Sequence, residues 1–158
     1  MKQYTLCMVC KDGKILLGMK KIRFGAGLWN GFGGGVEEGE SIQDAAYREL
    51  QEEAGIVALN MQKMGVVRFS FEEDATLQLE VHIFKTTDFT GEPVESDEMK
   101  PQWFTLSDIP YKQMWTDDEL WMPLLLEDKQ FEGTFHFDRP STAEYSAKIL
   151  RHDLKELG

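Results

Sequence analysis

Three glutamates, Glu49, Glu52 and Glu53, stand close together in a segment whose pattern predicts a helix over residues 42–54. At about 100° per residue, Glu49 and Glu53 share a stripe with the apolar residues of this helix, which are Ile42, Ala45 and Ala46. A carboxylate that faces a core is costly unless it is paired or binds a metal, and like charges this close repel unless a cation lies between them. Clustered carboxylates suit Mg²⁺ or Mn²⁺. The spacing therefore indicates either a divalent cation site or a solvated acidic helix face that Arg48 or a lysine neutralises.

A glycine-rich segment precedes this helix. Residues 25–39 contain seven glycines, three of them consecutive at Gly33, Gly34 and Gly35. Glycine density of this kind is typical of backbone with unusual φ or in close contact with a ligand. Such a turn can present carbonyl oxygens to a metal and let a phosphate chain come close. The glycines and the acidic helix together favour the cation site.

The two features combine into one pattern, which runs through Gly34, Glu40, Arg48-Glu49-Leu50, Glu52-Glu53 and Gly55-Ile56. The pattern is G-x5-E-x7-R-E-U-x-E-E-x-G-U, with U aliphatic, and it resembles the Nudix box with every specified position filled. The resemblance implies an α+β (α/β) Nudix fold, a mixed β-sheet sandwiched between α-helices, in a single domain over residues 1–158. It also implies Mg²⁺-dependent hydrolysis of a nucleoside diphosphate linked to another moiety, with Mn²⁺ as the alternative metal.

The resemblance also implies roles for individual residues. It assigns Glu49, Glu52 and Glu53 to metal binding and to the activation of water, with Arg48 as their partner. A carboxylate held beside a metal can take the proton of a water molecule, and we expect Glu53 to do so. The implied metal ligands are the carbonyl of Gly33 and the carboxylates of Glu49, Glu52, Glu53 and Glu98.

Three further motifs, "FGAG-WNGFGG", "PVESDEM-P-WF" and "MW-DD--W-PLLL", extend the similarity over roughly residues 4–138. They resemble the Nudix hydrolases that cleave oxidised purine nucleoside triphosphates such as 8-oxo-dGTP and 2-hydroxy-dATP to the monophosphate and pyrophosphate. Two alternatives remain open. One is a Nudix hydrolase for another nucleotide, such as a methylated purine triphosphate, CTP or a dinucleotide. The other is a nucleotide-binding regulator without activity, against which the intact cluster of repulsive glutamates argues.

The same resemblance implies a pocket for the base. Trp115 offers a flat face for stacking, Asn30 can donate and accept hydrogen bonds, and adjacent Asp117 and Asp118 would share one proton if both approach the base. The residues implied for substrate binding are Thr5, Lys20, Phe24, Asn30, Phe32, Gly33, Gly34, Gly35, Phe69, Phe71, Trp115, Thr116, Asp117 and Asp118.

The base-pocket residues also have ordinary structural interpretations. Thr116, Asp117 and Asp118 match the start of a helix over residues 116–128, with Thr116 as its N-cap, and Trp115 could be core. Thr116 also occupies a position where proline is expected in the similar hydrolases. This departure predicts a looser approach of Asp117 to the base.

The composition narrows the class of protein. The net charge is −11, which argues against a nucleic-acid polymer as partner, because phosphate contacts favour basic surfaces. No apolar run reaches the roughly 18 residues of a membrane-spanning helix. Cys7 and Cys10 lie three apart on a predicted strand and should face opposite ways as core thiols. We expect a cytoplasmic monomer that binds a small nucleotide and no membrane.

Alternation of apolar and polar residues predicts the strands that must position these groups. The tail over residues 142–157 is ambiguous, because its first half alternates like a strand and its second half could be helical. The predicted strands are residues 4–10, 15–20, 67–71, 77–84, 101–106 and 130–139.

Overall fold

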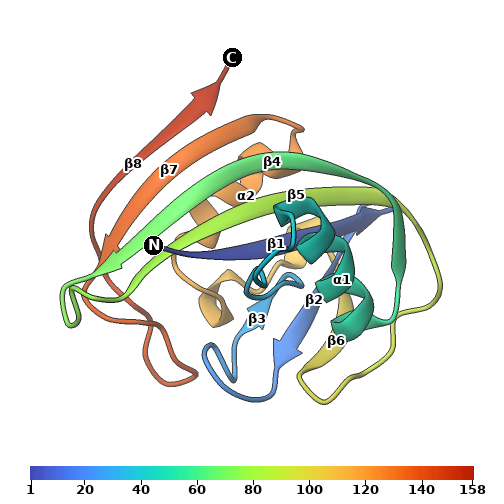
Figure 1. The fold of residues 1–158 in the computed structure, drawn as a ribbon, viewed down its shortest axis with the longest axis horizontal. Coiled ribbons are helices and arrows are strands. Elements are labelled where there is room, and N and C mark those ends of the chain that lie inside the picture. The colour runs from blue at the N-terminus through green and yellow to red at the C-terminus, as the bar shows by residue number, and fades with distance from the viewer.

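The computed structural model describes residues 1–158 as a mixed β-sheet with a helix on each face. Helix α1 (Ile42–Ala54) covers one face and helix α2 (Asp118–Leu126) lies on the other, as Figure 1 shows. Two short 3₁₀ turns, Leu106–Asp108 and Tyr111–Gln113, precede α2. The strands are β1 (Lys2–Lys11), β2 (Lys14–Lys20), β3 (Trp29–Asn30), β4 (Val57–Phe71), β5 (Gln78–Thr90), β6 (Met99–Thr105), β7 (Gln130–Phe137) and β8 (Ile149–Leu157). The predicted α+β class with a sheet between helices is confirmed.

The strand order of the sheet is β3-β2-β1-β5-β4-β7-β8, and β6 pairs along β2. Two of the pairings, β1 with β5 and β4 with β7, are parallel, and the others are antiparallel. β1 therefore lies inside the sheet, between its hairpin partner β2 and the distant strand β5. The long strands β4 and β5 bow across the molecule (Figure 1). This curvature leaves room beneath them for a cavity.

Two apolar cores lie on the two faces of the sheet. Cys7 and Leu50 belong to the core beneath α1, whereas Cys10 and Trp121 belong to the core beneath α2. The two cysteines therefore face opposite sides of β1, as predicted, and both are free thiols. Burial raises the pKa of Cys10 to about 11, so this thiol is not a nucleophile at neutral pH.

Helix α1 has the ends that its sequence predicts. The hydroxyl of Ser41 accepts a hydrogen bond from the amide of Asp44, at 3.0 Å. Gly55 closes the helix with φ of 72°, and its amide donates to the carbonyl of Gln51 at 2.9 Å. These local signals fix where the acidic residues of α1 stand relative to the sheet.

Two predictions about the second half of the chain are wrong. Helix α2 begins at Asp118 with Asp117 at its N-cap, and the hydroxyl of Thr116 donates instead to the carbonyl of Ala147. The helical option for the end of the tail also fails, because residues 149–157 form strand β8 against β7. Pairing with β8 satisfies the backbone groups along one side of β7. Such a pairing is a tertiary effect, which the local propensities of residues 149–157 do not predict.

No helix of the chain is long and apolar enough to cross a membrane.

Candidate active site

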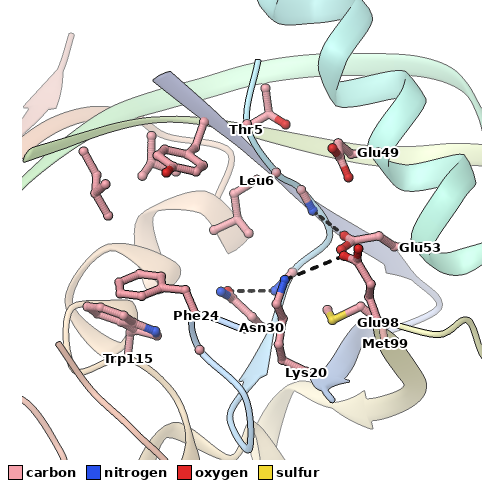
Figure 2. A pocket seen from close by; sticks show the side chains of 18 of the residues that line it. Thr5, Leu6, Lys20, Phe24, Asn30, Glu49, Glu53, Glu98, Met99 and Trp115 are labelled. Atoms are coloured by element: carbon pink, nitrogen blue, oxygen red, sulfur yellow. Dashed lines mark hydrogen bonds and ion pairs between the residues drawn. The ribbon is translucent and has the colours of Figure 1, made fainter. Parts of the chain in front are cut away.

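A cavity of about 460 Å³ opens between the glycine-rich loop, the bowed strands and the start of α2. Figure 2 shows Glu49, Glu53 and Glu98 gathered at one end of this cavity, and Phe24 and Trp115 at the other. The cavity therefore joins an acidic end, supplied mainly by α1, to an aromatic end.

The glycine loop lies directly against β1. The amide of Thr5 donates to the carbonyl of Gly34 at 2.9 Å. A Cβ atom at Gly33 would stand 1.8 Å from the backbone oxygen of Thr5, and one at Gly34 would stand 2.5 Å from a carboxylate oxygen of Glu49. Only glycine fits at position 33, because a side chain there would separate the loop from β1, whereas a side chain at position 34 would displace the Glu49 carboxylate.

Arg48 holds the acidic residues of the box in place. Its Nε and Nη2 donate to the two oxygens of Glu40, at 2.7 and 3.0 Å, and its Nη1 donates to Glu49 at 3.0 Å and Glu52 at 3.1 Å. The hydrogen bond from Arg48 holds the pKa of Glu40 below its ordinary value. Glu52 is 58 % exposed, so it belongs to the solvated face of the helix as the chain stands.

Glu53 is the buried acid of the helix. Its side chain is only 3 % exposed, and one of its oxygens accepts a hydrogen bond from the amide of Gly33 at 2.8 Å. Burial raises the pKa of Glu53 to about 8, although the hydrogen bond from Gly33 opposes the rise. Burial also raises the pKa of Glu49, against the nearby charge of Arg48. These two residues are therefore not the ordinary solvated acids that the alternative interpretation requires.

Glu98 completes the acidic end from the loop that precedes β6. One of its oxygens accepts from Arg23 Nη1 at 2.7 Å, and the other lies 3.9 Å from Lys20 Nζ. Arg23 and Lys20 both line the cavity. Glu98 therefore stands between these cations and the carboxylates of α1.

The acidic end has the chemistry of a site for a hard divalent cation. No three acidic, histidine or cysteine side chains stand close enough to hold a cation as they lie. The carboxylates at the acidic end nevertheless offer only oxygen atoms as ligands, and the charges of Glu49 and Glu98 each raise the pKa of Glu53. The carbonyl of Gly33 accepts no hydrogen bond from the chain. Oxygen donors whose mutual repulsion a cation would relieve fit Mg²⁺ or Mn²⁺.

At the aromatic end, Trp115 is enclosed by other rings. Phe69 stacks parallel to Trp115 with ring centroids 5.9 Å apart, and Phe24 tilts toward Trp115 at 5.4 Å. Trp115 is buried, whereas Phe24 is 51 % exposed at the edge of the cavity. This end offers a flat apolar surface of the kind that binds a nucleobase.

Two adjacent aspartates are buried beside this aromatic surface. Trp121 Nε1 donates to one oxygen of Asp117 at 2.7 Å, while the other oxygen of Asp117 and one oxygen of Asp118 have no partner. Burial raises the pKa of Asp117 to about 6. Burial, and then the charge of Asp117, raises the pKa of Asp118 well above its ordinary value. Buried polar atoms without partners are rare in folded chains, and here both residues line the cavity.

The cavity brings together most of the residues that the sequence singled out. Phe32, Phe71 and Thr116 are the exceptions, because they lie behind its lining. Phe32 is fully buried in the core beneath α1, and Phe71 packs edge-on against Trp115. The predicted residues that do line the cavity are Thr5, Lys20, Phe24, Asn30, Gly33, Gly34, Gly35, Arg48, Glu49, Glu52, Glu53, Phe69, Glu98, Trp115, Asp117 and Asp118.

Sequence reasoning did not single out several lining residues. Arg23 had no motif to mark it, and the apolar floor comes from strand residues that alternate like any other core residues. The side chains of this floor are Leu6, Val67, Leu79, Val81 and Met99. Only the inward-facing register of β1, β4, β5 and β6 identifies them.

Comparison with known proteins settles the family. The model of the NUDIX domain matches residues 1–125 of the chain. The chain belongs to the Nudix family.

Relatives within the Nudix family match nearly the whole chain. The oxidized purine nucleoside triphosphate hydrolase of Danio rerio is 52% identical over 156 residues, which cover 99% of this chain and 96% of that protein. The mouse protein of the same name is 47% identical over 154 residues, covering 98% and 94%. Among solved structures, a mutator MutT protein from Bacillus halodurans superimposes with a TM-score of 0.82 at 28% identity, covering 98% of this chain and 97% of that one. The Nudix fold is therefore confirmed.

The aspartate pair predicts a dependence of stability on pH. Because the pKa of Asp118 is raised on folding, the folded chain holds a proton that the unfolded chain releases near pH 4. This contribution to stability falls as the pH rises above about 4 and through the raised pKa. We expect Asp118→Asn to gain stability over the parent chain as the pH rises from 4.5 to 8, because the amide has no proton to lose.

Urea unfolding at several pH values measures this difference. Asp88→Asn, which changes an exposed aspartate of β5, is the matched control. A stability difference between Asp118→Asn and the parent that stays constant with pH would contradict the raised pKa.

Proposed function

We propose that this Nudix protein hydrolyses oxidised purine nucleoside triphosphates, such as 8-oxo-dGTP and 2-hydroxy-dATP, to the monophosphate and pyrophosphate, and that it uses Mg²⁺ or Mn²⁺. One observation carries the proposal: a single cavity has buried carboxylates at one end and two unpartnered aspartate oxygens beside Trp115 at the other. The names of the zebrafish and mouse relatives support the same substrate class. The substrate is a small nucleotide, and the protein acts as a cytoplasmic monomer.

The acidic end performs the hydrolysis. When bound there, a divalent cation supplies neutralisation of the charge that develops on the phosphoryl oxygens. Glu53 takes a proton from the attacking water, whose oxygen forms the new bond to phosphorus. The anhydride oxygen between the α and β phosphorus atoms leaves with the electrons of the broken bond. The residues that would hold the cation are the carbonyl of Gly33 and the carboxylates of Glu49, Glu52, Glu53 and Glu98.

The aromatic end selects the base. Stacking on Trp115 is worth about 1–3 kcal/mol for any base, so it cannot by itself distinguish an oxidised purine. Asp117 and Asp118 supply the discrimination, because a protonated aspartate donates a hydrogen bond where an ionised one accepts it. With one proton between them, the pair can match more than one oxidised purine edge. Asn30 adds a donor and an acceptor from the glycine loop.

A panel of nucleotides tests the reaction. The protein with Mg²⁺ is incubated with normal and oxidised purine triphosphates, a methylated purine triphosphate, CTP and a dinucleotide, and the products of hydrolysis are separated and quantified. We expect oxidised purine triphosphates to give the highest kcat/KM. A higher kcat/KM for any other member of the panel would refute the proposed substrate class. No turnover of any nucleotide would refute the enzymatic function and favour a nucleotide-binding protein without activity.

The role of Glu53 predicts the effect of one substitution. Glu53→Gln keeps the size of the side chain and an oxygen that can accept from Gly33, but it cannot take a proton from water. We expect kcat to fall by at least about 100-fold, the usual contribution of a general base, without a lower melting temperature. Glu73→Gln, which changes an exposed acid of the β4–β5 hairpin, is the control. Full activity of Glu53→Gln would refute this choice of base.

The aspartate pair predicts a change in substrate preference. Asp117→Asn keeps an acceptor for Trp121 but replaces a carboxyl that can exist in two protonation states with an amide that has one. We expect kcat/KM for 8-oxo-dGTP and for 2-hydroxy-dATP to change by different factors, roughly tenfold apart, as expected for one buried hydrogen bond. Steady-state kinetics with both nucleotides checks this, and equal values for variant and parent would contradict the shared proton.

A further inference from the structure

Residues 138–148, which connect β7 to β8, form a compact segment that we call the β7–β8 segment. Its two ends are joined, because the carboxylate of Asp138 accepts hydrogen bonds from the amides of Arg139 and Lys148 and from the hydroxyl of Tyr145. The middle is fixed by Ser141, whose buried hydroxyl accepts from the amide of Ala147 at 2.9 Å. The segment is therefore held in shape by its own hydrogen bonds.

The β7–β8 segment contacts the start of α2 at one point. The hydroxyl of Thr116 donates to the carbonyl of Ala147 at 2.9 Å. Ala147 is only 3 % exposed and packs into the same core as Trp115. Thr116 lies between Trp115 and Asp117 in the chain, so this hydrogen bond fixes the backbone that carries both of these cavity residues. The looser approach of Asp117 predicted from the sequence is thus countered by a tether from another part of the chain.

The segment contacts the loop that carries Phe24 at a second point. Ala143 packs against Gly27 so closely that a Cβ atom at Gly27 would lie 2.4 Å from the Cβ of Ala143. Gly27 also has φ of 85°, which favours glycine. Gly27 follows Phe24 in the same loop, and the ring of Phe24 faces Trp115 at 5.4 Å. One segment therefore touches both loops whose aromatic rings flank the entrance to the aromatic end.

We propose that the β7–β8 segment sets the distance between Phe24 and Trp115 and thereby the selectivity for the base. Thr116, which is hydrogen-bonded to this segment, is the residue that positions Trp115 and Asp117. Phe24 is half exposed, so its own burial does little to fix the loop. The contact of Gly27 with Ala143 adds to the backbone hydrogen bonds that close the loop, in which Gly27 donates to Lys20 at 2.8 Å and Leu28 donates to Gly25 at 3.2 Å. The proposal rests on the proposed function for the identity of the substrate. On this proposal, residues behind the cavity influence which base is accepted. They have no effect on the breaking of the phosphoanhydride bond.

The decisive experiment compares Thr116→Val, which removes only the donor, with Thr116→Ser, which keeps it. We expect Thr116→Val to raise KM for 8-oxo-dGTP about three- to tenfold, the range of one hydrogen bond, with kcat within about twofold. The ratio of kcat/KM for 8-oxo-dGTP to that for dGTP should fall by the same factor. Thr116→Ser should restore both values. Thr134→Val, at an exposed threonine of β7 outside the β7–β8 segment, should leave them unchanged.

Gly27→Ala tests the second contact independently. The added methyl group must push Ala143 or the Phe24 loop aside, and we expect the same loss of discrimination with an unchanged kcat. Melting temperatures of all variants show whether the chain still folds. Parental discrimination in both Thr116→Val and Gly27→Ala, or an equal fall in kcat for every nucleotide, would overturn the proposal.

Binding separates this inference from the proposed function. Quenching of tryptophan fluorescence by the two nucleotides reports their relative affinity without turnover. If the parent chain turns over neither nucleotide, the proposed function fails, whereas a loss of binding selectivity in Thr116→Val would still support the positioning role. Unchanged binding selectivity in both variants would refute that role whatever the catalytic result.

Discussion

The hydrogen bond from the Gly33 amide to the Glu53 carboxylate joins the two parts of the chain on which the cavity depends. Through it, helix α1 is docked onto the glycine loop, which is itself paired with β1. The bond places a carboxylate where water is scarce and where one amide and the nearby charge of Lys20 only partly compensate for its burial. The acidic end is therefore held in a state that gains stability from an added positive charge, and this is a property of the fold before any substrate arrives.

The two ends of the cavity solve the problem of buried acids in different ways. At the acidic end the residues come from a helix and two loops, and Arg48 neutralises the outermost of them. At the aromatic end, Asp117 and Asp118 have only Trp121 as a side-chain donor. A proton retained by this pair therefore reduces their mutual repulsion, as a bound cation would do at the acidic end. This difference matches the two halves of a nucleotide, since phosphates need positive charge and a base edge needs donors and acceptors.

How far the sequence predicted this site depended on how local each signal was. Ser41, Gly55 and the apolar stripe define α1 within one stretch of chain, so the helix, its ends and its facing acids were predictable. The family resemblance supplied Glu98 and the base-pocket residues, which no local pattern connects to α1. Neither the local patterns nor the resemblance predicted the hydrogen bond between Thr116 and Ala147. It joins residues 31 apart, and Ala147 lies in a segment without regular structure. Strand β8 was missed for a related reason, since its partner β7 determines its conformation.

The parallel pairing of β1 with β5 has a consequence for the order in which the molecule assembles. Gln3 meets Glu80, 77 residues later, and closing so large a loop carries an entropic cost before any contact rewards it. β1 can pair with β2 early, but it must wait for β5 to gain its parallel partner during synthesis. The aromatic end waits longer still, because Trp115 and the β7–β8 segment follow later in the chain. A nascent chain thus acquires its acidic helix well before it can hold a base.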